Sequence, residues 1–75
     1  MNTYDYPLIV EPLPAEEGGG FMARAPDLPG CMSDGETPAE AVINVQDAIM
    51  VWIDDAVEHK RPVPAPSRAL NLAAA

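Results

Sequence analysis

Cysteine, positive charge and long apolar runs are all scarce in this sequence. The single cysteine, Cys31, cannot form a disulfide within the chain. Four Lys and Arg residues stand against twelve Asp and Glu residues, and the net charge of -8 disfavours contact with phosphate backbones and anionic lipid. No apolar run approaches the ~18 residues of a membrane span, and the first residues lack the pattern of a secretory signal. We therefore expect a cytoplasmic protein with a basic protein partner and no direct contact with membrane or nucleic acid.

The sequence does contain enough apolar material for one small folded domain. Hydrophobic residues make up 48% of the 75 residues and charged residues 21%, a balance typical of a chain that packs a core. A domain this small buries only about 60% of the surface that its unfolded chain exposes. A large catalytic cleft is therefore not expected, no cofactor is implied, and a homo-oligomer, a dimer or higher, would supply further stability.

Three short segments are predicted to form β-strands. The first has aromatic and branched side chains at alternating positions, the second is short and alternating, and the third has a weaker pattern. The first two are joined by a break of Pro, Glu and Gly residues, which predicts a hairpin, and a run of turn formers precedes the third. We expect an α+β domain with a mainly antiparallel sheet of three or four strands. The predicted strands cover residues 4–13, with Tyr4, Tyr6, Leu8 and Val10 on one side, residues 21–25 and residues 31–36.

A long helix is predicted over residues 38–58, where no Gly and no internal Pro interrupts the chain. Thr37 is suited to cap the first amides, and Pro38 is suited to the first helical position. His59 follows the helix, where a cation interacts favourably with the helix dipole, and we expect this role rather than general base catalysis. An apolar stripe is expected to cover one face of the sheet, and it consists of Ala41, Val42, Val45, Ala48, Ile49, Trp52, Ile53 and Ala56.

A second, narrower set of apolar residues recurs every seven positions on the same helix. This helix ridge consists of Ile43, Met50 and Val57, flanked by Asp47 and Asp54. A helix on one sheet needs apolar side chains on one side only, so the helix ridge is a candidate self-association surface, as is the sheet face that the helix leaves uncovered. Scattered apolar side chains are also common on protein surfaces, and that interpretation stays open.

Three prolines follow the helix, at positions 62, 64 and 66. Proline has no amide hydrogen to donate, so Val63 can belong only to a short edge strand. The residues after Ser67 are small, rich in alanine and without a helix cap. We expect one domain over residues 1–67, followed at 68–75 by a tail or by the start of a further segment.

The turns and strand ends form a series whose order and spacing are more specific than any single piece. Its members are Tyr6-Pro7, Glu17-Gly18-Gly19-Gly20-Phe21, Pro26-Asp27-Leu28-Pro29-Gly30-Cys31, Gly35-Glu36-Thr37, Glu40-Ala41 and Pro64-Ala65-Pro66-Ser67. Over residues 4–67 this series resembles the N-terminal domain of the HicB antitoxin family. The resemblance implies a partial ribonuclease H-like fold, β-β-β-α-β, that silences a small HicA-like toxin, a ribonuclease that cuts messenger RNA with a catalytic histidine. Longer family members carry a C-terminal DNA-binding domain, for which nothing after Ser67 provides the sequence.

Acidic side chains are the candidate contacts to such a toxin. A protein that holds RNA phosphates needs a basic surface, and an acidic protein can occupy that surface as a charge mimic. We expect these side chains to promote a salt-sensitive encounter. The candidates are Asp47, Asp54, Asp55 and Glu58 on the helix and Glu16 and Glu17 at the hairpin.

Two other functions are open alternatives to a binding role as an antitoxin. A magnesium-dependent nuclease remnant would use clustered carboxylates, but the spacing of the candidates defines no metal site and turns or caps account for them. A solitary module that binds another protein or a ligand is the second alternative. Cys31 has no neighbouring His or Lys to activate it, so we expect a half-buried strand residue and not a nucleophile. The nuclease candidates are Asp5, Asp27, Asp34 and Glu40.

Overall fold

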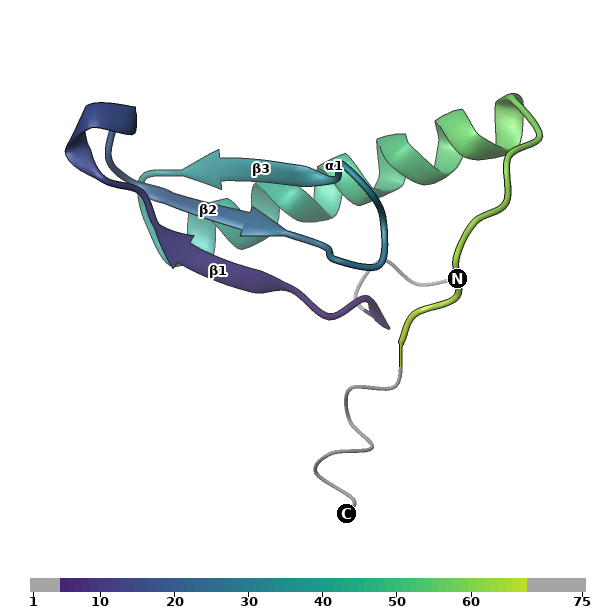
Figure 1. The fold of residues 1–75 in the computed structure, drawn as a ribbon, viewed down its shortest axis with the longest axis horizontal. Helices are drawn as coiled ribbons and strands as arrows, with labels where there is room; N and C mark the ends of the chain where they lie inside the picture. The colour runs from purple at the N-terminus through teal and green to yellow at the C-terminus, as the bar shows by residue number, and fades with distance from the viewer. Residues whose placement is uncertain (1–4, 68–75) are drawn as a thin grey trace, which may run out of the picture.

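The computed structural model describes residues 5–67. The three strands form one antiparallel sheet in the order β1-β2-β3, and the helix α1 lies along one face of it (Figure 1). This two-layer arrangement confirms the predicted α+β class. In chain order the elements are β1 (Ile9–Pro12), the short 3-10 helix η2 (Ala15–Glu17), β2 (Phe21–Arg24), β3 (Met32–Gly35) and α1 (Pro38–Glu58).

The register of the sheet decides which side chains face the helix. Ala23 of β2, which is fully buried, pairs with Val10 of β1 and Ser33 of β3. Side chains alternate between the two faces along a strand, so the residues on either side of Ala23 point away from the helix. We call that side the open sheet face. It carries two cross-strand rows, one of Ile9, Arg24 and Met32 and one of Glu11, Met22 and Asp34.

Helix α1 begins and ends at the predicted residues. Thr37 has an extended backbone, and its Oγ1 accepts a hydrogen bond from the Glu40 N–H at 3.1 Å, as an N-cap does. Leu28 of the turn between β2 and β3 is fully buried in the core. The predicted stripe faces this core: Ala41, Val45, Ile49 and Ala56 are buried, and Val42, Ala48, Trp52 and Ile53 are partly buried.

Within residues 5–67, no helix is both long and apolar enough to cross a membrane.

Two glycines allow the helix to start close against β3. A Cβ atom at Gly35 would lie 2.5 Å from the backbone nitrogen of Ala41, and one at Gly20 would lie 2.7 Å from the carbonyl oxygen of Gly35. Both distances are too short for a side chain, so only glycine fits without a shift of the backbone. The hairpin loop, β3 and the first turn of α1 are therefore packed backbone against backbone.

The first strand is shorter than the alternating pattern predicted. β1 begins at Ile9, because Pro7 offers no amide hydrogen to a ladder and the Tyr6 side chain turns into the core. Val10 shares a face with Ala23 but stays 38% exposed, since α1 lies mainly against β2 and β3. Tyr4, which we placed in this strand, lies outside the described residues.

The segment after the helix is extended but joins no strand in the described part of the chain. Val63 therefore forms no edge strand there, because the alternating prolines around it remove the donors of a ladder. Two hydrogen bonds hold the segment instead: the Tyr6 OH donates to the Pro64 carbonyl at 2.6 Å, and the Ser67 N–H donates to Asp27 Oδ2 at 2.6 Å. The expected tail at 68–75 lies outside the described residues.

Candidate partner-binding site

The side of α1 that points away from the sheet carries four large exposed apolar residues. The helix ridge predicted from the sequence is among them, with Ile43 63%, Met50 54% and Val57 64% exposed. Val51, which the sequence analysis did not single out, is 67% exposed. The helix packs on the sheet through its buried stripe alone, and these exposed side chains take no part in that packing. They are therefore available for contact with a partner.

Carboxylates are set among these apolar side chains. Residues three and four positions apart are neighbours on a helix surface, so Asp47 lies beside Ile43, Met50 and Val51. Asp54 lies in the same way beside Met50, Val51 and Val57. Neither aspartate forms an ion pair within residues 5–67. We call this surface the outer helix face, and it consists of Ile43, Asp47, Met50, Val51, Asp54, Val57 and Glu58.

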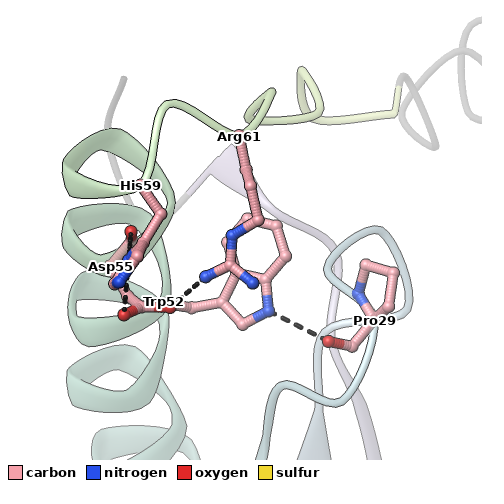
Figure 2. A network of polar contacts seen from close by, with 5 residues as sticks. All are labelled: Pro29, Trp52, Asp55, His59 and Arg61. Atoms are coloured by element: carbon pink, nitrogen blue, oxygen red, sulfur yellow. Dashed lines mark hydrogen bonds and ion pairs between the residues drawn. The ribbon is translucent and has the colours of Figure 1, made fainter.

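Asp55 belongs to a different environment from the other predicted contact residues. Figure 2 shows Arg61 directed back to Asp55, with which it forms an ion pair, while His59 Nδ1 lies 3.2 Å from Asp55 Oδ1. Lys60 makes this return possible because it adopts the left-handed conformation, with φ 57°, that ends many helices. The charge of Asp55 is therefore balanced within the chain, and it is a weaker candidate for a partner than Asp47 or Asp54.

The same end of the helix is fixed to the sheet layer by its tryptophan. Trp52 Nε1 donates a hydrogen bond to the Pro29 carbonyl at 2.9 Å (Figure 2). Trp52 is partly buried and packs against the core, which confirms the structural role expected for it. His59 is the C-cap residue of α1, as its predicted position at the helix end required.

The hairpin end of the molecule holds a second acidic group. Glu16 and Glu17 are exposed on η2, at the opposite end of the molecule from the C-terminus of α1 (Figure 1). The six predicted contact residues therefore do not form one patch. Beside η2 is a hollow of about 480 Å³, where three further acidic residues, Asp34, Glu36 and Glu40, meet the glycine loop. Sequence reasoning did not assign Glu36 to a surface, because its approach to the loop depends on the tertiary contact at Gly35.

The open sheet face combines exposed apolar side chains with charges of both signs. Ile9 is 40% exposed, Met32 is 51% exposed, and Met22 in the neighbouring row is partly buried. Arg24 Nη2 lies 3.6 Å from Glu11 Oε1 across the face, a solvent-exposed ion pair. This face therefore differs from the outer helix face, on which every charge is negative.

The four carboxylates considered for a nuclease do not come together. Asp5 and Asp27 lie near Tyr6, whereas Asp34 and Glu40 border the hollow at the hairpin. Among residues 5–67, no three His, Cys, Asp or Glu side chains form a group that could hold a metal ion.

Two buried groups have shifted pKa values for structural reasons. Burial raises the pKa of the Tyr6 phenol, and the negative charges of Asp27 and Asp5 raise it further. Burial also raises the pKa of the Cys31 thiol, which keeps it protonated and unreactive. Cys31 is only 4% exposed, so it is more deeply buried than the half-buried position expected.

Comparison with known proteins identifies the family to which this fold and these surfaces belong. The family model described as "HicB_like antitoxin of bacterial toxin-antitoxin system" matches residues 6–75. A UPF0150 protein of Synechocystis is 38% identical over 63 residues, which cover 84% of this chain and 76% of that protein. A UPF0150 protein of Thermoplasma acidophilum is 37% identical over 49 residues, covering 65% of this chain and 71% of that protein.

A relative with a functional name is also similar to this chain. The protein named Antitoxin HicB of Escherichia coli strain K12 is 36% identical over 62 residues, which cover 83% of this chain and 43% of that protein. The match of the family model over nearly the whole sequence agrees with the motif series and with the sheet and helix described above. The chain therefore belongs to the HicB-like antitoxin family of bacterial toxin-antitoxin systems.

Proposed function

We propose that this chain neutralises a small, basic, HicA-like toxin that cleaves messenger RNA, by covering the toxin's RNA-binding surface through protein-protein contact. Membership of the antitoxin family supports the class of function. The HicA-like partner and the surface that contacts it are proposed in addition to that class. The proposed contact needs no cofactor and no catalysis by this chain. We propose that it takes place in the cytoplasm, where a toxin that cleaves messenger RNA would act.

The outer helix face is the observation that carries this proposal. It combines exposed apolar side chains with Asp47, Asp54 and Glu58, which have no ion-pair partner within residues 5–67. A ribonuclease presents basic side chains to hold phosphates, and carboxylates can pair with those side chains in place of the phosphates. The apolar residues between the carboxylates then supply short-range contact, while the charges accelerate and orient the encounter.

The hairpin-end acids contribute to the same encounter from a distance. Glu16 and Glu17 lie at the hairpin, near the start of α1. Asp47 lies nine residues after Pro38 and Asp54 sixteen residues after it, about 14 Å and about 24 Å along the helix at ~1.5 Å per residue. At physiological salt these separations exceed the Debye length of about 8 Å, so the two acidic groups act nearly independently. We place the main contact on the outer helix face and assign Glu16 and Glu17, with Asp55, a smaller steering effect.

The first experiment is to purify the chain with the small basic protein encoded beside it and to measure RNA cleavage with and without the chain. Tight association with loss of cleavage is expected. The double variant Asp47→Lys with Asp54→Lys should weaken the complex by about 10- to 100-fold, roughly 1.4 to 2.8 kcal/mol, and reduce its salt dependence.

The double variant Glu11→Lys with Asp34→Lys is the matched control, because it makes the same change of charge on the open sheet face. It should leave toxin affinity nearly unchanged. Equal effects of the helix and sheet variants would contradict the proposed contact surface, while leaving the antitoxin function itself intact. Absence of any complex or inhibition would contradict that function, and cleavage by the chain alone, dependent on magnesium, would favour the nuclease alternative.

A further inference from the structure

The exposed side of α1 carries a line of residues whose spacing is that of a coiled coil. They follow one another at alternating intervals of three and four positions, and carboxylates alternate with apolar side chains along the line. A straight α-helix drifts by about 20° per heptad relative to this spacing, so the six side chains stay within one narrow band. We call this line the helix seam, and it consists of Glu40, Ile43, Asp47, Met50, Asp54 and Val57.

We propose that the helix seam docks a single α-helix of the toxin. That helix would carry apolar residues at one of its two seam positions in each heptad and Lys or Arg at the other. The inference rests on the proposed function, and it names the element of the partner that the outer helix face receives.

The helix seam lies on the opposite side of α1 from the core. At about 100° per residue, its mean direction is nearly opposite to that of the buried residues Ala41, Val45 and Ile49. The sheet covers only the other side of α1 (Figure 1), and no side chain of the seam forms an ion pair within residues 5–67. A second helix can therefore lie along the whole seam without displacing any described contact.

The spacing of the carboxylates favours a helix over an extended segment. Successive carboxylates of the seam are seven residues apart, about 10.5 Å along α1 at ~1.5 Å per residue. A partner helix repeats its own seam at the same interval, so one cation can meet each carboxylate. An extended strand presents side chains on one face about every 6.6 Å, and it falls out of step after the first pair.

The charges of the seam decide which helix can dock. A second copy of α1 would bring three more carboxylates into the contact and no cation, which disfavours self-association through the helix ridge. A helix with an apolar seam would leave the three carboxylates unpaired. The seam is flanked by the uncharged residues Gln46 and Val51, so the charges that specify the partner lie within the seam itself. They also specify the register, because a shift by one seam position would place each cation against an apolar side chain.

The length of the seam indicates a weak contact for an isolated helix. From Glu40 to Val57 the seam is about 26 Å long, so one docked helix buries less than the ~800 Å² per partner of a standard interface. We expect a dissociation constant of about 20 to 500 µM for such a helix alone.

Three synthetic peptides of equal length test the proposal on the full chain. The seam peptide has Leu and Arg alternating at the heptad seam positions, with Ala and Gln elsewhere. The reversed peptide has Glu in place of Arg. The rearranged peptide has the composition and net charge of the seam peptide, but its Arg residues lie on the opposite face from its Leu residues.

Isothermal titration calorimetry should show that the seam peptide binds about tenfold or more tightly than either control. Its circular dichroism should gain helical signal on binding, because short isolated helices are marginal in water. Equal affinity for the seam and rearranged peptides would overturn the proposal, since attraction between opposite net charges would then be sufficient. Binding without a gain of helix would overturn a helix as the occupant.

A charge exchange on the chain separates a lost contact from a lost fold. The double variant Asp47→Arg with Asp54→Arg should lose affinity for the seam peptide and gain affinity for the reversed peptide, a gain that a misfolded chain cannot show. Unchanged preference for the seam peptide would refute the pairing of cations with these carboxylates.

The peptides also distinguish failure of this inference from failure of the proposed function. If no seam peptide binds while Asp47→Lys with Asp54→Lys still weakens the toxin complex, the helical occupant is wrong and the proposed function stands. If the seam peptide binds to a chain that inhibits no RNA cleavage, a basic helix remains the occupant but the toxin is overturned as its source.

Discussion

The outer helix face and the open sheet face expose similar apolar side chains but differ in their charges. The outer helix face carries only carboxylates, whereas the open sheet face carries charges of both signs. On the helix, Asp47 and Asp54 are surrounded by apolar residues and have no cation beside them in the described part of the chain. On the sheet, Arg24 and Glu11 already compensate one another. Apolar exposure therefore marks a surface as available, whereas the pattern of charge selects what binds there.

The largest effect is expected from a substitution in the core that supports both faces. Ile49 is fully buried between the helix and the sheet. Ile49→Ala should lower the free energy of unfolding by about 2 to 5 kcal/mol, because it deletes buried methylene groups and leaves a cavity. Urea denaturation measures this change, and toxin binding should then decline as the folded fraction falls. An Ile49→Ala chain as stable as the wild type would contradict the assigned core.

A smaller change should affect the helix more than the sheet. Thr37→Ala removes the acceptor for the Glu40 N–H and should cost about 1 kcal/mol of stability. Amide hydrogen exchange in the first turn of α1 should accelerate, while exchange in β2 changes only through global unfolding. Thr37→Ser keeps a hydroxyl at the cap and serves as the control. Uniform acceleration across helix and sheet would show that the first turn does not open separately.

The smallest effect is expected from a substitution of Tyr6, which should affect the segment after the helix and leave both faces unchanged. The Tyr6 OH donates to Pro64, and the raised pKa of Tyr6 favours the neutral phenol in the folded state. This contribution is constant below pH ~10, the usual pKa of tyrosine, and is lost as the pH rises through the higher folded value.

Tyr6→Phe should therefore lower stability by about 1 kcal/mol at neutral pH and reduce the alkaline loss of stability. Thermal unfolding followed from pH 7 to pH 11 measures both effects. Toxin binding at pH 7 should be unchanged wherever the variant is folded. An unaltered alkaline profile would mean that Tyr6 does not contribute to this transition.

Local signals in the sequence were sufficient for the helix but not for the first strand. Thr37, Pro38 and the apolar spacing determine α1 through contacts within a few residues, and its predicted bounds match the structure. The start of β1 depends on the contact of Tyr6 with Pro64, which is 58 positions away in the sequence. Periodicity in a short segment contains no information on such a contact.

The candidate surfaces were also predictable only in part, because local spacing determines some of their features and tertiary structure the others. Helical spacing placed the helix ridge and Asp47 on one side of α1, and their exposure is confirmed. The pairing of Asp55 with Arg61 requires the chain to turn back at Lys60, and the two rows of the open sheet face require the strand register. Both depend on tertiary structure, so the sequence alone did not predict them.

The single tryptophan of this chain also gives the domain an intrinsic optical reporter. Trp52 belongs to the inner stripe, and its indole nitrogen donates a hydrogen bond to the Pro29 carbonyl, so it lies outside the outer helix face. Unfolding would expose the indole to water and shift its fluorescence to longer wavelength, whereas docking on the outer helix face would leave its surroundings intact. Fluorescence of the unlabelled protein can therefore distinguish a variant that has lost a contact from one that has lost its fold.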